Sequence, residues 1–420
     1  MKKVAIIGGQ RIPFVKSFTH YNRISNQEML TACLQALTER YQLAGKRVGD
    51  VALGALLNRS TEWNFARECV LGTNLDPHTP AYNVQRACGT SLDTTIQLSL
   101  RIAAGQIDTG IAGGSDTNSD LPLLLSQQLS WKLTALRAAK SFGERLKILA
   151  SIRLKELAPV YPAVVEPRTG LSMGQHTERM VKEWGIHREE QDALAWQSHL
   201  NATKAWDTGF YDDLVFPYKG VTKDTIVRSD TSAEKLAKLK PAFDFSGQGT
   251  LTAGNSTIYT DGAAAMLLAS EEYAQQQKWP VMAHFVDAES AAVDYVHGEG
   301  LLMAPTYAVA RLLKRQHLRL QDFDIYEIHE AFCGQVLCTL KAWEDPVYCK
   351  KLGYDAPLGS IDRSKLNTRG GSVAIGHPFC ATGARIVAQT AKLLQERGSG
   401  RALISICTAG GMGVVAILQR

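Results

Sequence analysis

The sequence predicts an α/β protein made of two similar halves, with a mainly helical region inserted into the first half. Three observations favour this fold class. Apolar strand-like runs alternate with helical patterns over residues 1–120, helical patterns dominate residues 121–240, and strand-like runs return over residues 276–420. The chain has 420 residues and 45% hydrophobic content, which is enough for more than one layered domain.

The first half is predicted to comprise residues 1–120 and 241–275, on either side of the insertion at residues 121–240. Its strands are expected where short apolar runs are bounded by turn residues, and its first helix where apolar residues recur at helical spacing. The predicted strands are residues 4–8, 51–56, 110–114 and 262–269, and the predicted helix is residues 26–41.

The second half, residues 276–420, repeats this texture. Residues 262–268 resemble residues 413–418 as a closing strand, and residues 110–114 resemble residues 404–407 and the glycines that follow. This similarity indicates an internal duplication. The predicted strands of the second half are residues 281–286, 324–328, 402–406 and 414–418.

The net charge of +5 is concentrated in residues 121–160, which we call the basic segment. The rest of the chain is neutral overall, which argues against a general nucleic-acid-binding surface. Basic and large apolar residues interleave here and predict one or two amphipathic helices with a cationic face. Such helices contact an anionic membrane surface or a partner protein, or they form a solvated face over the active-site cleft. The charged residues are Lys132, Arg137, Lys140, Arg145, Lys147, Arg153 and Lys155, against Glu144 and Glu156.

Cysteine usage and the absence of a long apolar run favour a cytoplasmic protein, with peripheral membrane contact through the basic segment as an option. The eight cysteines form no CxxC pair, so free thiols in a reducing compartment are expected. No run approaches the roughly 20 apolar residues of a membrane span. Residues 1–7 are predicted to be a buried strand and not a signal peptide.

Cys88 is the first candidate catalytic residue. Leu92, Ile96, Leu100 and Ala104 recur at helical spacing after it, so Cys88 is predicted at a helix N-terminus. The helix dipole and the free N–H groups there favour a thiolate and are expected to lower the pKa of the thiol, which makes a nucleophile. The alternative is a buried structural cysteine.

His377 and Cys407 are the other two candidates. Glycines flank His377 in Gly376-His377-Pro378, so a substrate can approach an imidazole that acts as a base or as a donor to an oxyanion. Cys407 ends a predicted strand before the turn Ala409-Gly410-Gly411, whose N–H groups can bind an anion. The alternatives are a turn histidine and a core cysteine.

Two further motifs surround these residues. His329-Glu330-Ala331-Phe332 follows a predicted strand, and Cys333 stands where a zinc-protease motif would have its second histidine. A His329/Cys333 pair would supply only two metal ligands, so no metal is expected. The polar loop at residues 252–257 is either part of a site or an ordinary turn.

These motifs, in this order, resemble the thiolase family almost from end to end, from Arg11-Ile12-Pro13-Phe14 to Gly410-Gly411-Met412-Gly413. The resemblance implies the thiolase fold, with two duplicated, layered αβαβα-type halves and an inserted loop domain. It also implies roles for the candidate residues. Cys88 would be the acylated nucleophile, His377 would activate it and help bind the thioester oxygen, and Cys407 would be the general acid/base. The backbone N–H groups of Cys88 and Ala409 would form the oxyanion hole for acyl transfer.

His329 stands where many thiolases have an asparagine that holds a water in a second oxyanion hole. In this respect the chain is similar to the β-subunit of the trifunctional fatty-acid oxidation complex, and Glu330 is expected to support the site. Whether His329 binds the water or touches the thioester directly stays open. The positions that the resemblance assigns to coenzyme A binding are Met173, Arg228, Ala253, Ser256, Thr257, Ala331 and Phe332.

The resemblance implies a 3-ketoacyl-CoA thiolase that cleaves 3-ketoacyl-CoA with coenzyme A in fatty-acid β-oxidation. Coenzyme A is then a substrate, and no cofactor is expected. The alternatives are an acetoacetyl-CoA thiolase acting in condensation and an inactive subunit that binds a partner or a membrane. A homodimer or homotetramer is implied, and a hydratase/dehydrogenase α-subunit is a candidate partner.

Overall fold

A computed structural model describes residues 1–420 and places the strands in one mixed sheet. Nine strands are hydrogen-bonded in the order β4-β3-β5-β6-β1-β7-β10-β9-β8, and a short β2 pairs with β6. The strands are β1 (Val4–Arg11), β2 (Val15–Lys16), β3 (Asp50–Gly54), β4 (Ala81–Asn83), β5 (Thr109–Asp116), β6 (Thr260–Ser270), β7 (Ala283–Ala292), β8 (Ile325–Ile328), β9 (Arg401–Thr408) and β10 (Met412–Gln419).

The strand pairing repeats in the two halves and so confirms the expected duplication. In the first half, β1 pairs antiparallel with β6, β6 antiparallel with β5, and β5 parallel with β3. In the second half, β7 pairs antiparallel with β10, β10 antiparallel with β9, and β9 parallel with β8. An antiparallel β1–β7 pair joins the halves. Thus β6 corresponds to β10 and β5 to β9, which are the segments whose sequences resemble each other.

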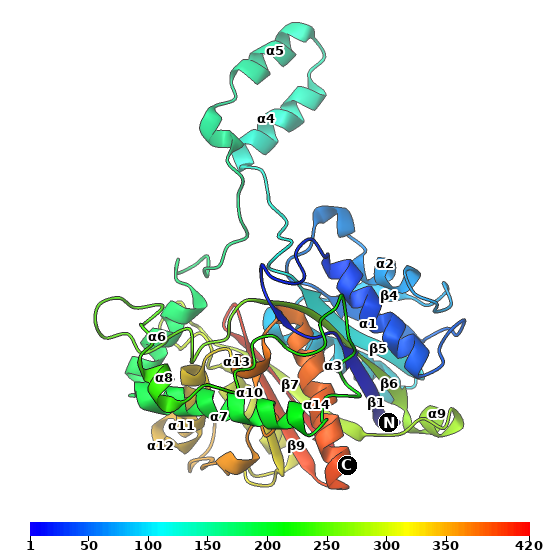
Figure 1. Cartoon of the computed structure of the whole chain (residues 1–420), viewed down its shortest axis with the longest axis vertical. Coiled ribbons are helices and arrows are strands. Elements are labelled where there is room, and N and C mark those ends of the chain that lie inside the picture. Colours follow the sequence, from blue (N-terminus) through cyan, green and yellow to red (C-terminus); the bar gives the residue numbers. More distant parts are fainter.

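Helices cover both faces of each half and create five layers (Figure 1). Helices α1 and α2 cover the outer face of the first half, α10 and α11 cover that of the second half, and α3 packs against α14 between them. The remaining helices belong mainly to the insertion and to the second half. The helices are α1 (Asn26–Arg40), α2 (Phe65–Leu71), α3 (Thr90–Ala103), α4 (Gln127–Ala138), α5 (Phe142–Ala150), α6 (Met173–Glu183), α7 (Arg188–Asp207), α8 (Ala233–Ala237), α9 (Glu271–Gln276), α10 (Ala304–Gln316), α11 (Cys333–Glu344), α12 (Pro346–Lys351), α13 (Ser372–Ile375) and α14 (Thr382–Arg397).

The period-two alternation of the strands explains the layering. On β6, Met266 and Leu268 pack in the central core with α3 and α14, whereas Ala265 and Leu267 pack in the outer core with α1. Every residue of β6 is buried, so the strand is an apolar run without a polar face. The catalytic candidates lie where the first turns of α3 and α14 meet the C-terminal end of β9.

The basic segment forms two short helices, α4 and α5. They stand away from the body, joined to it by two extended stretches of chain (Figure 1). An antiparallel bridge between Leu124 and Val160 closes its base. Two helices are therefore present where the sequence predicts one or two, and both project outward from the body (Figure 1). The boundaries of the insertion at residues 121 and 240 stay a prediction.

No helix in the chain combines the length and the apolar character that crossing a membrane would require.

Candidate active site

Cys88 lies in a single 3₁₀ turn (Ala87–Gly89) that leads directly into α3, so its predicted place at a helix N-terminus is confirmed. The residue before it, Ala87, has a left-handed backbone with φ of 43°, which is unfavourable for a residue with a Cβ. The Thr90 hydroxyl donates to the Ala87 carbonyl at 2.7 Å and holds this turn. The sharp turn sets the sulfur at the junction of the two halves.

His377 lies between α13 and the first turn of α14. Gly376, immediately before it, has φ of 114°, a conformation that favours glycine. The backbone N–H of His377 donates to Thr260 Oγ1 at 2.8 Å, and Nδ1 lies 2.7 Å from Thr382 Oγ1. Both contacts fix the ring, and the second occupies Nδ1, so Nε2 is the nitrogen left for the site.

His329 follows the last residue of β8, and its backbone N–H donates to the Ser405 carbonyl of β9 at 2.8 Å. Its Nδ1 lies 2.7 Å from Ser372 Oγ, whereas its buried Nε2 has no hydrogen-bond partner. Glu330 is buried beside it, as the expected polar support. The Glu330 carboxylate accepts from Ser198, Asn367 and the Val373 backbone N–H.

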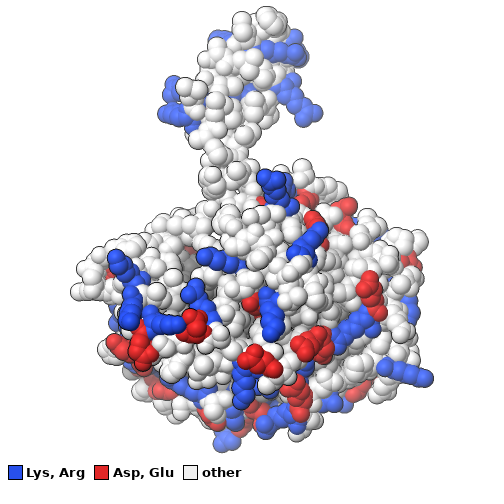
Figure 2. All heavy atoms as spheres, viewed as in Figure 1, with Lys and Arg blue, Asp and Glu red and all other residues white.

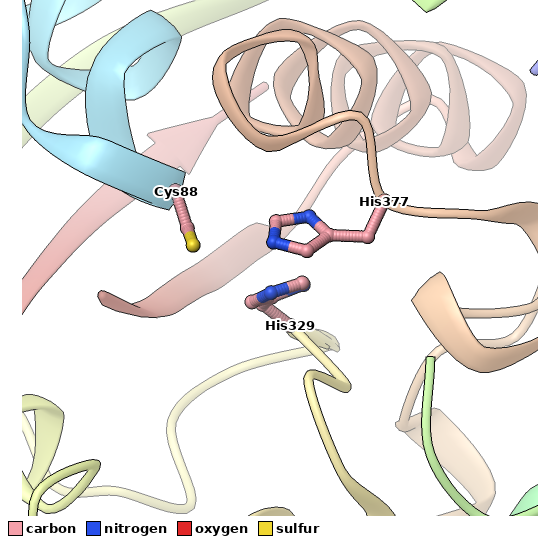
Figure 3. A group of neighbouring side chains, drawn as sticks. All are labelled: Cys88, His329 and His377. Atoms are coloured by element: carbon pink, nitrogen blue, oxygen red, sulfur yellow. The ribbon is translucent and has the colours of Figure 1, made fainter. Parts of the chain in front are cut away.

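The three side chains converge (Figure 3). The Cys88 sulfur and one ring nitrogen each of His329 and His377 all lie within 4.8 Å of one another. The imidazole rings are 4.2 Å apart between centroids. The three residues come from segments far apart in the sequence, so their convergence depends on the fold. Each of these atoms is a candidate metal ligand, but they also form a thiol–imidazole arrangement suited to acyl transfer.

Burial controls the charge state of this centre. It raises the pKa of the Cys88 thiol to about 12, although the N–H groups of Ala409 and of Cys88 itself donate toward the sulfur and lower it. The prediction of a lowered pKa for Cys88 is therefore wrong, because the helix-terminus effect is smaller than the cost of burying a thiolate. Burial, with the Arg385 charge, lowers the pKa of His377 to about 3. Burial, His377 and Arg385 also lower the pKa of His329 well below its usual value. The centre is thus a neutral thiol beside two neutral imidazoles.

Cys407 lies near the end of β9 and is buried. Burial, and then the charge of Cys88, raise its pKa well above the usual value, so the two thiols influence each other electrostatically. It packs in an apolar cluster with Ala331 and Phe332, two of the residues expected to bind coenzyme A. The turn after it contains Gly410 and Gly411, whose φ values of 76° and 69° are left-handed. This conformation turns the Ala409 N–H toward the sulfur of Cys88.

The residues expected to bind coenzyme A fall into two groups. Met173 packs against the apolar cluster that contains Cys407, Ala331 and Phe332, and the Thr257 N–H donates to the Ala331 carbonyl at 3.1 Å. Ser256 forms an antiparallel bridge with Phe332. These five residues therefore lie together beside Cys407. Arg228 and Ala253 are exposed on the surface.

Several residues that hold this site have no local signal in the sequence. Ser372 and Thr382 each bind the Nδ1 of one histidine, and the Arg385 guanidinium donates to Ser372 at 2.8 Å. The Glu166 carboxylate, from the loop after the basic segment, accepts from the Gly410 N–H at 2.8 Å and thereby holds the turn after Cys407. The His329–Ser372 and Glu166–Gly410 pairs are remote in sequence, so only the fold reveals them.

The fold and the sequence were compared with known proteins. Two family models match, the thiolase N-terminal domain over residues 4–272 and the thiolase C-terminal domain over residues 279–420. A 3-ketoacyl-CoA thiolase of Shewanella sp. (strain W3-18-1) is 40% identical over 425 aligned residues, which cover 100% of this chain and 97% of that protein. The 3-ketoacyl-CoA thiolase of Shewanella woodyi is 41% identical, with 99% and 97% covered.

Solved structures agree with the sequence comparison. The acetyl-CoA acetyltransferase of Bacillus anthracis superimposes with a TM-score of 0.83 and 29% identity, covering 100% of this chain and 99% of that one. Human mitochondrial 3-ketoacyl-CoA thiolase gives 0.81 and 26%, with the same coverage. The layered, duplicated fold, the full-length match to both domain models and the convergence of Cys88, His329 and His377 therefore lead to one conclusion: the chain belongs to the thiolase family of acyltransferases.

Proposed function

We propose that this protein is a 3-ketoacyl-CoA thiolase that cleaves 3-ketoacyl-CoA with coenzyme A, through an acyl-enzyme on Cys88, in fatty-acid β-oxidation. The observation that carries the proposal is the convergence of the Cys88 sulfur with one nitrogen of His329 and one of His377 within 4.8 Å. The full-length similarity to 3-ketoacyl-CoA thiolases supports the same substrate class.

In the first half-reaction, His377 takes the proton from the Cys88 thiol while the sulfur attacks the 3-keto carbon. A neutral pair needs this coupling, because neither a free thiolate nor a free imidazolium is stable in a buried site. The C2–C3 bond then breaks, and its electron pair moves into an acetyl-CoA enolate. His329 and His377 stabilise the enolate oxygen, and Cys407 donates the proton to C2.

In the second half-reaction, Cys407 accepts the proton of the coenzyme A thiol, whose sulfur attacks the acyl carbon on Cys88. The tetrahedral oxyanion accepts hydrogen bonds from the N–H groups of Cys88 and Ala409, the two groups that donate toward the Cys88 sulfur in the free enzyme. One such donor contributes about 3–4 kcal/mol to the stability of a transition state of acyl transfer. Collapse of the intermediate breaks the C–S bond to Cys88 and releases the shortened acyl-CoA. The leaving Cys88 sulfur takes back the proton held by His377, which restores the neutral pair.

The coenzyme A chain is proposed to pass Met173, Ser256, Thr257, Ala331 and Phe332, which lie together beside Cys407. Arg228 and Ala253 are exposed, and their proposed role is to contact the outer part of coenzyme A, where a cation and a small residue suit the nucleotide phosphates and their close approach.

Thiolysis assays test the proposal. Acetoacetyl-CoA and a long-chain 3-ketoacyl-CoA should both be cleaved, with a higher kcat/KM for the long chain. A preference for acetoacetyl-CoA would favour an acetoacetyl-CoA thiolase acting in condensation, which the likeness to the Bacillus anthracis enzyme also supports. No cleavage of either substrate by the pure folded protein would favour an inactive subunit.

Two variants separate the proposed roles of the thiols. Cys88→Ser should reduce thiolysis to background and abolish acyl labelling. Cys407→Ser should reduce turnover by about 10²–10⁴-fold, because a general acid/base is lost, and still allow Cys88 to be acylated. An acyl label found on a residue other than Cys88 would contradict these assignments.

We also propose that the basic segment contacts an anionic membrane surface. Phe142, Leu146 and Leu149 form a helical stripe on α5 and are 81%, 57% and 48% exposed. Of the two acidic residues in the segment, Glu156 is ion-paired with Lys132. The visible face of this segment shows basic residues and no acidic ones (Figure 2). Apolar side chains that stand outward among cations suit an anionic lipid interface.

Vesicle flotation tests this contact. The protein should float with vesicles that contain phosphatidylserine and not with pure phosphatidylcholine, and reversing Lys140, Arg145 and Lys147 to Glu should abolish flotation. Reversal of the exposed Arg47, Lys314 and Lys350 on the body is the matched control and should leave it intact. Unchanged flotation of the first triple variant would contradict the proposal. Loss of co-purification with a hydratase/dehydrogenase subunit, without any vesicle binding, would assign the segment to a protein partner instead.

A further inference from the structure

A buried chain of hydrogen bonds leads away from the active site through His329. The Nδ1 of His329 lies 2.7 Å from Ser372 Oγ, and the Arg385 Nη2 donates to the same oxygen at 2.8 Å. All three side chains are buried, with exposed fractions of 1%, 0% and 3%. The other ring nitrogen of His329 is buried without a partner. The thiolase reaction as proposed above assigns no role to Ser372 or Arg385.

The donor and acceptor properties of these groups restrict the position of the His329 hydrogen. A guanidinium only donates, so Arg385 occupies a lone pair of Ser372 Oγ and leaves the hydroxyl hydrogen to find an acceptor. The only other group bonded to this oxygen is His329 Nδ1. If Nδ1 carried the hydrogen, the Ser372 hydrogen would be buried without an acceptor. If Nδ1 is bare, it accepts the Ser372 hydroxyl hydrogen, and the hydrogen of the neutral ring sits on Nε2.

We propose that Ser372, held by Arg385, is a positioning residue that fixes His329 as the tautomer with its hydrogen on Nε2, directed at the thioester oxygen of the substrate. The inference rests on the proposed function. With its hydrogen on Nε2, His329 donates to the substrate oxygen or to a water that takes its place. Ser372 itself does not touch the reacting atoms.

Under this proposal, His329 and His377 have different roles in catalysis. The proposed base role of His377 requires a bare Nε2, and the hydrogen on its Nδ1 would then be directed at Thr382 Oγ1, 2.7 Å away. His329 is a donor from the start. His377 becomes a second donor only after it has removed the Cys88 proton, when the enolate oxygen needs two. The ring centroids of His329 and His377 are 4.2 Å apart. This short distance is compatible with a free enzyme in which His329 Nε2 is a donor and His377 Nε2 is an acceptor.

Arg385 is anchored for this task by the layer behind it. It lies on α14. Burial lowers the pKa of Arg385, and the charge of Glu327, two residues before His329 on β8, opposes this shift. Gln389 Nε2 donates to Glu327 Oε2 at 3.0 Å and holds that carboxyl group in place. The positive charge of Arg385 also disfavours a second proton on His329. The guanidinium therefore both orients the Ser372 hydroxyl and keeps His329 neutral.

The decisive experiment reads the tautomer directly. In ¹⁵N spectra of histidine-labelled full-length protein, with His329 assigned by its loss in His329→Asn, the wild-type ring should carry its hydrogen on Nε2. In Ser372→Ala, the His329 signal should show hydrogen on Nδ1. Ser405→Ala, which removes a nearby buried hydroxyl without a hydrogen-bond partner, is the matched control and should leave the His329 signal unchanged. A Ser372→Ala spectrum that still shows only the Nε2–H form would overturn the proposal.

Thiolysis kinetics provide a second test of the role of Ser372. Ser372→Ala should lower kcat for thiolysis by about 10–100-fold with a smaller change in KM. In the His329→Asn background the same change should cost less than about threefold, because an amide donor needs no tautomer to be set. An equal loss in both backgrounds would show that Ser372 acts elsewhere and would refute the role. Absence of thiolysis in the wild type would refute the proposed function, whereas the ¹⁵N result would stand by itself.

Discussion

Cys88 and His377 differ from a cysteine-protease pair in their resting charge. Burial raises the pKa of the thiol to about 12 and, with Arg385, lowers the pKa of the imidazole to about 3. A thiolate–imidazolium pair is therefore disfavoured in the free enzyme, and the proton moves only when the substrate offers a developing oxyanion in exchange. The unfavourable φ of Ala87 and the N–H groups directed at the sulfur prepare this exchange, since both are in place before the substrate binds.

This neutral resting state predicts the pH dependence of Cys88 alkylation. The rate of reaction with iodoacetamide should rise continuously with pH from 6 to 10, because the thiolate fraction keeps increasing below a pKa of about 12. Mass spectrometry of the labelled peptide measures the rate, and Cys88→Ser identifies the signal. A plateau reached below pH 8 would reveal a preformed ion pair and contradict the prediction.

The buried His199 leads to a prediction of how acid changes the free energy of unfolding. Burial, then Arg228, lower its pKa to about 4, and its Nδ1 accepts from the Arg228 backbone N–H at 3.2 Å. The unfolded chain binds a proton at this residue below pH 6.5, whereas the folded chain does so only below about 4. The folded state therefore loses stability as the pH falls through this window, by about 3 kcal/mol from this group.

The comparison with His199→Asn isolates this contribution, since the amide oxygen retains an acceptor and does not titrate. The difference in free energy of unfolding between the variant and the wild type should shift in favour of the variant by about 3 kcal/mol between pH 7 and pH 4. Urea unfolding at each pH measures it. A difference independent of pH would show that His199 is not neutral in the fold.

At the scale of elements, the strands and α3 were predictable, whereas α14, which packs against α3 in the central layer, was not. Every predicted strand has a counterpart in the structure, because an apolar run between turns is a local property. Helix α14 has a polar stripe at helical spacing, but its members Arg385 and Gln389 are buried, so the stripe does not face solvent as the pattern would indicate. Its close contact with α3 depends on small residues from two distant segments and becomes visible only in the fold.

The contact between α3 and α14 predicts a severe effect for one substitution. Gly383 lies so close to the backbone of Leu92 that an added Cβ would overlap the Leu92 nitrogen. Gly383→Ala should therefore cost about 1–3 kcal/mol in the free energy of unfolding, and it should reduce thiolysis because Cys88 precedes α3. Gly143→Ala in α5, where no atom lies within 4 Å of the added carbon, is the control and should be neutral. A neutral result at Gly383 would contradict the packing described here.

At the scale of the whole molecule, the site could be predicted in part. Cys88, His377 and Cys407 stand in glycine-rich motifs, and these motifs carry chemistry that the sequence displays. The charge state of Cys88 could not be predicted, because burial arises from both halves of the fold. The same is true of Ser372, which lies 43 positions after His329 and becomes its partner only when α13 packs beside β8. The sequence thus predicts which groups react, and the fold determines their protonation.

The arrangement of the whole molecule also predicts that the basic segment can be removed without unfolding the catalytic body. The Leu124–Val160 bridge brings the two ends of the segment together as an antiparallel pair just below α4 and α5, where the two extended stretches from the body meet (Figure 1). Residues 125–159 can therefore be replaced by a short Gly-Ser linker without pulling the ends apart. Beyond Leu129 and Glu156, the segment contributes no buried side chain between residues 121 and 160, so the cores of the two halves should remain intact.

The shortened chain should keep its free energy of unfolding within about 1 kcal/mol and its thiolysis of acetoacetyl-CoA within a factor of two, but it should no longer float with anionic vesicles. Glu166 follows the deleted residues and must keep its bond to the Gly410 N–H, so a Glu166→Gln variant of the full chain provides the comparison for damage to that contact. If thiolysis falls in the shortened chain as it does in Glu166→Gln, the segment positions the turn after Cys407 as well. If flotation persists, the membrane contact lies on the body, and the proposed docking role of the segment is wrong.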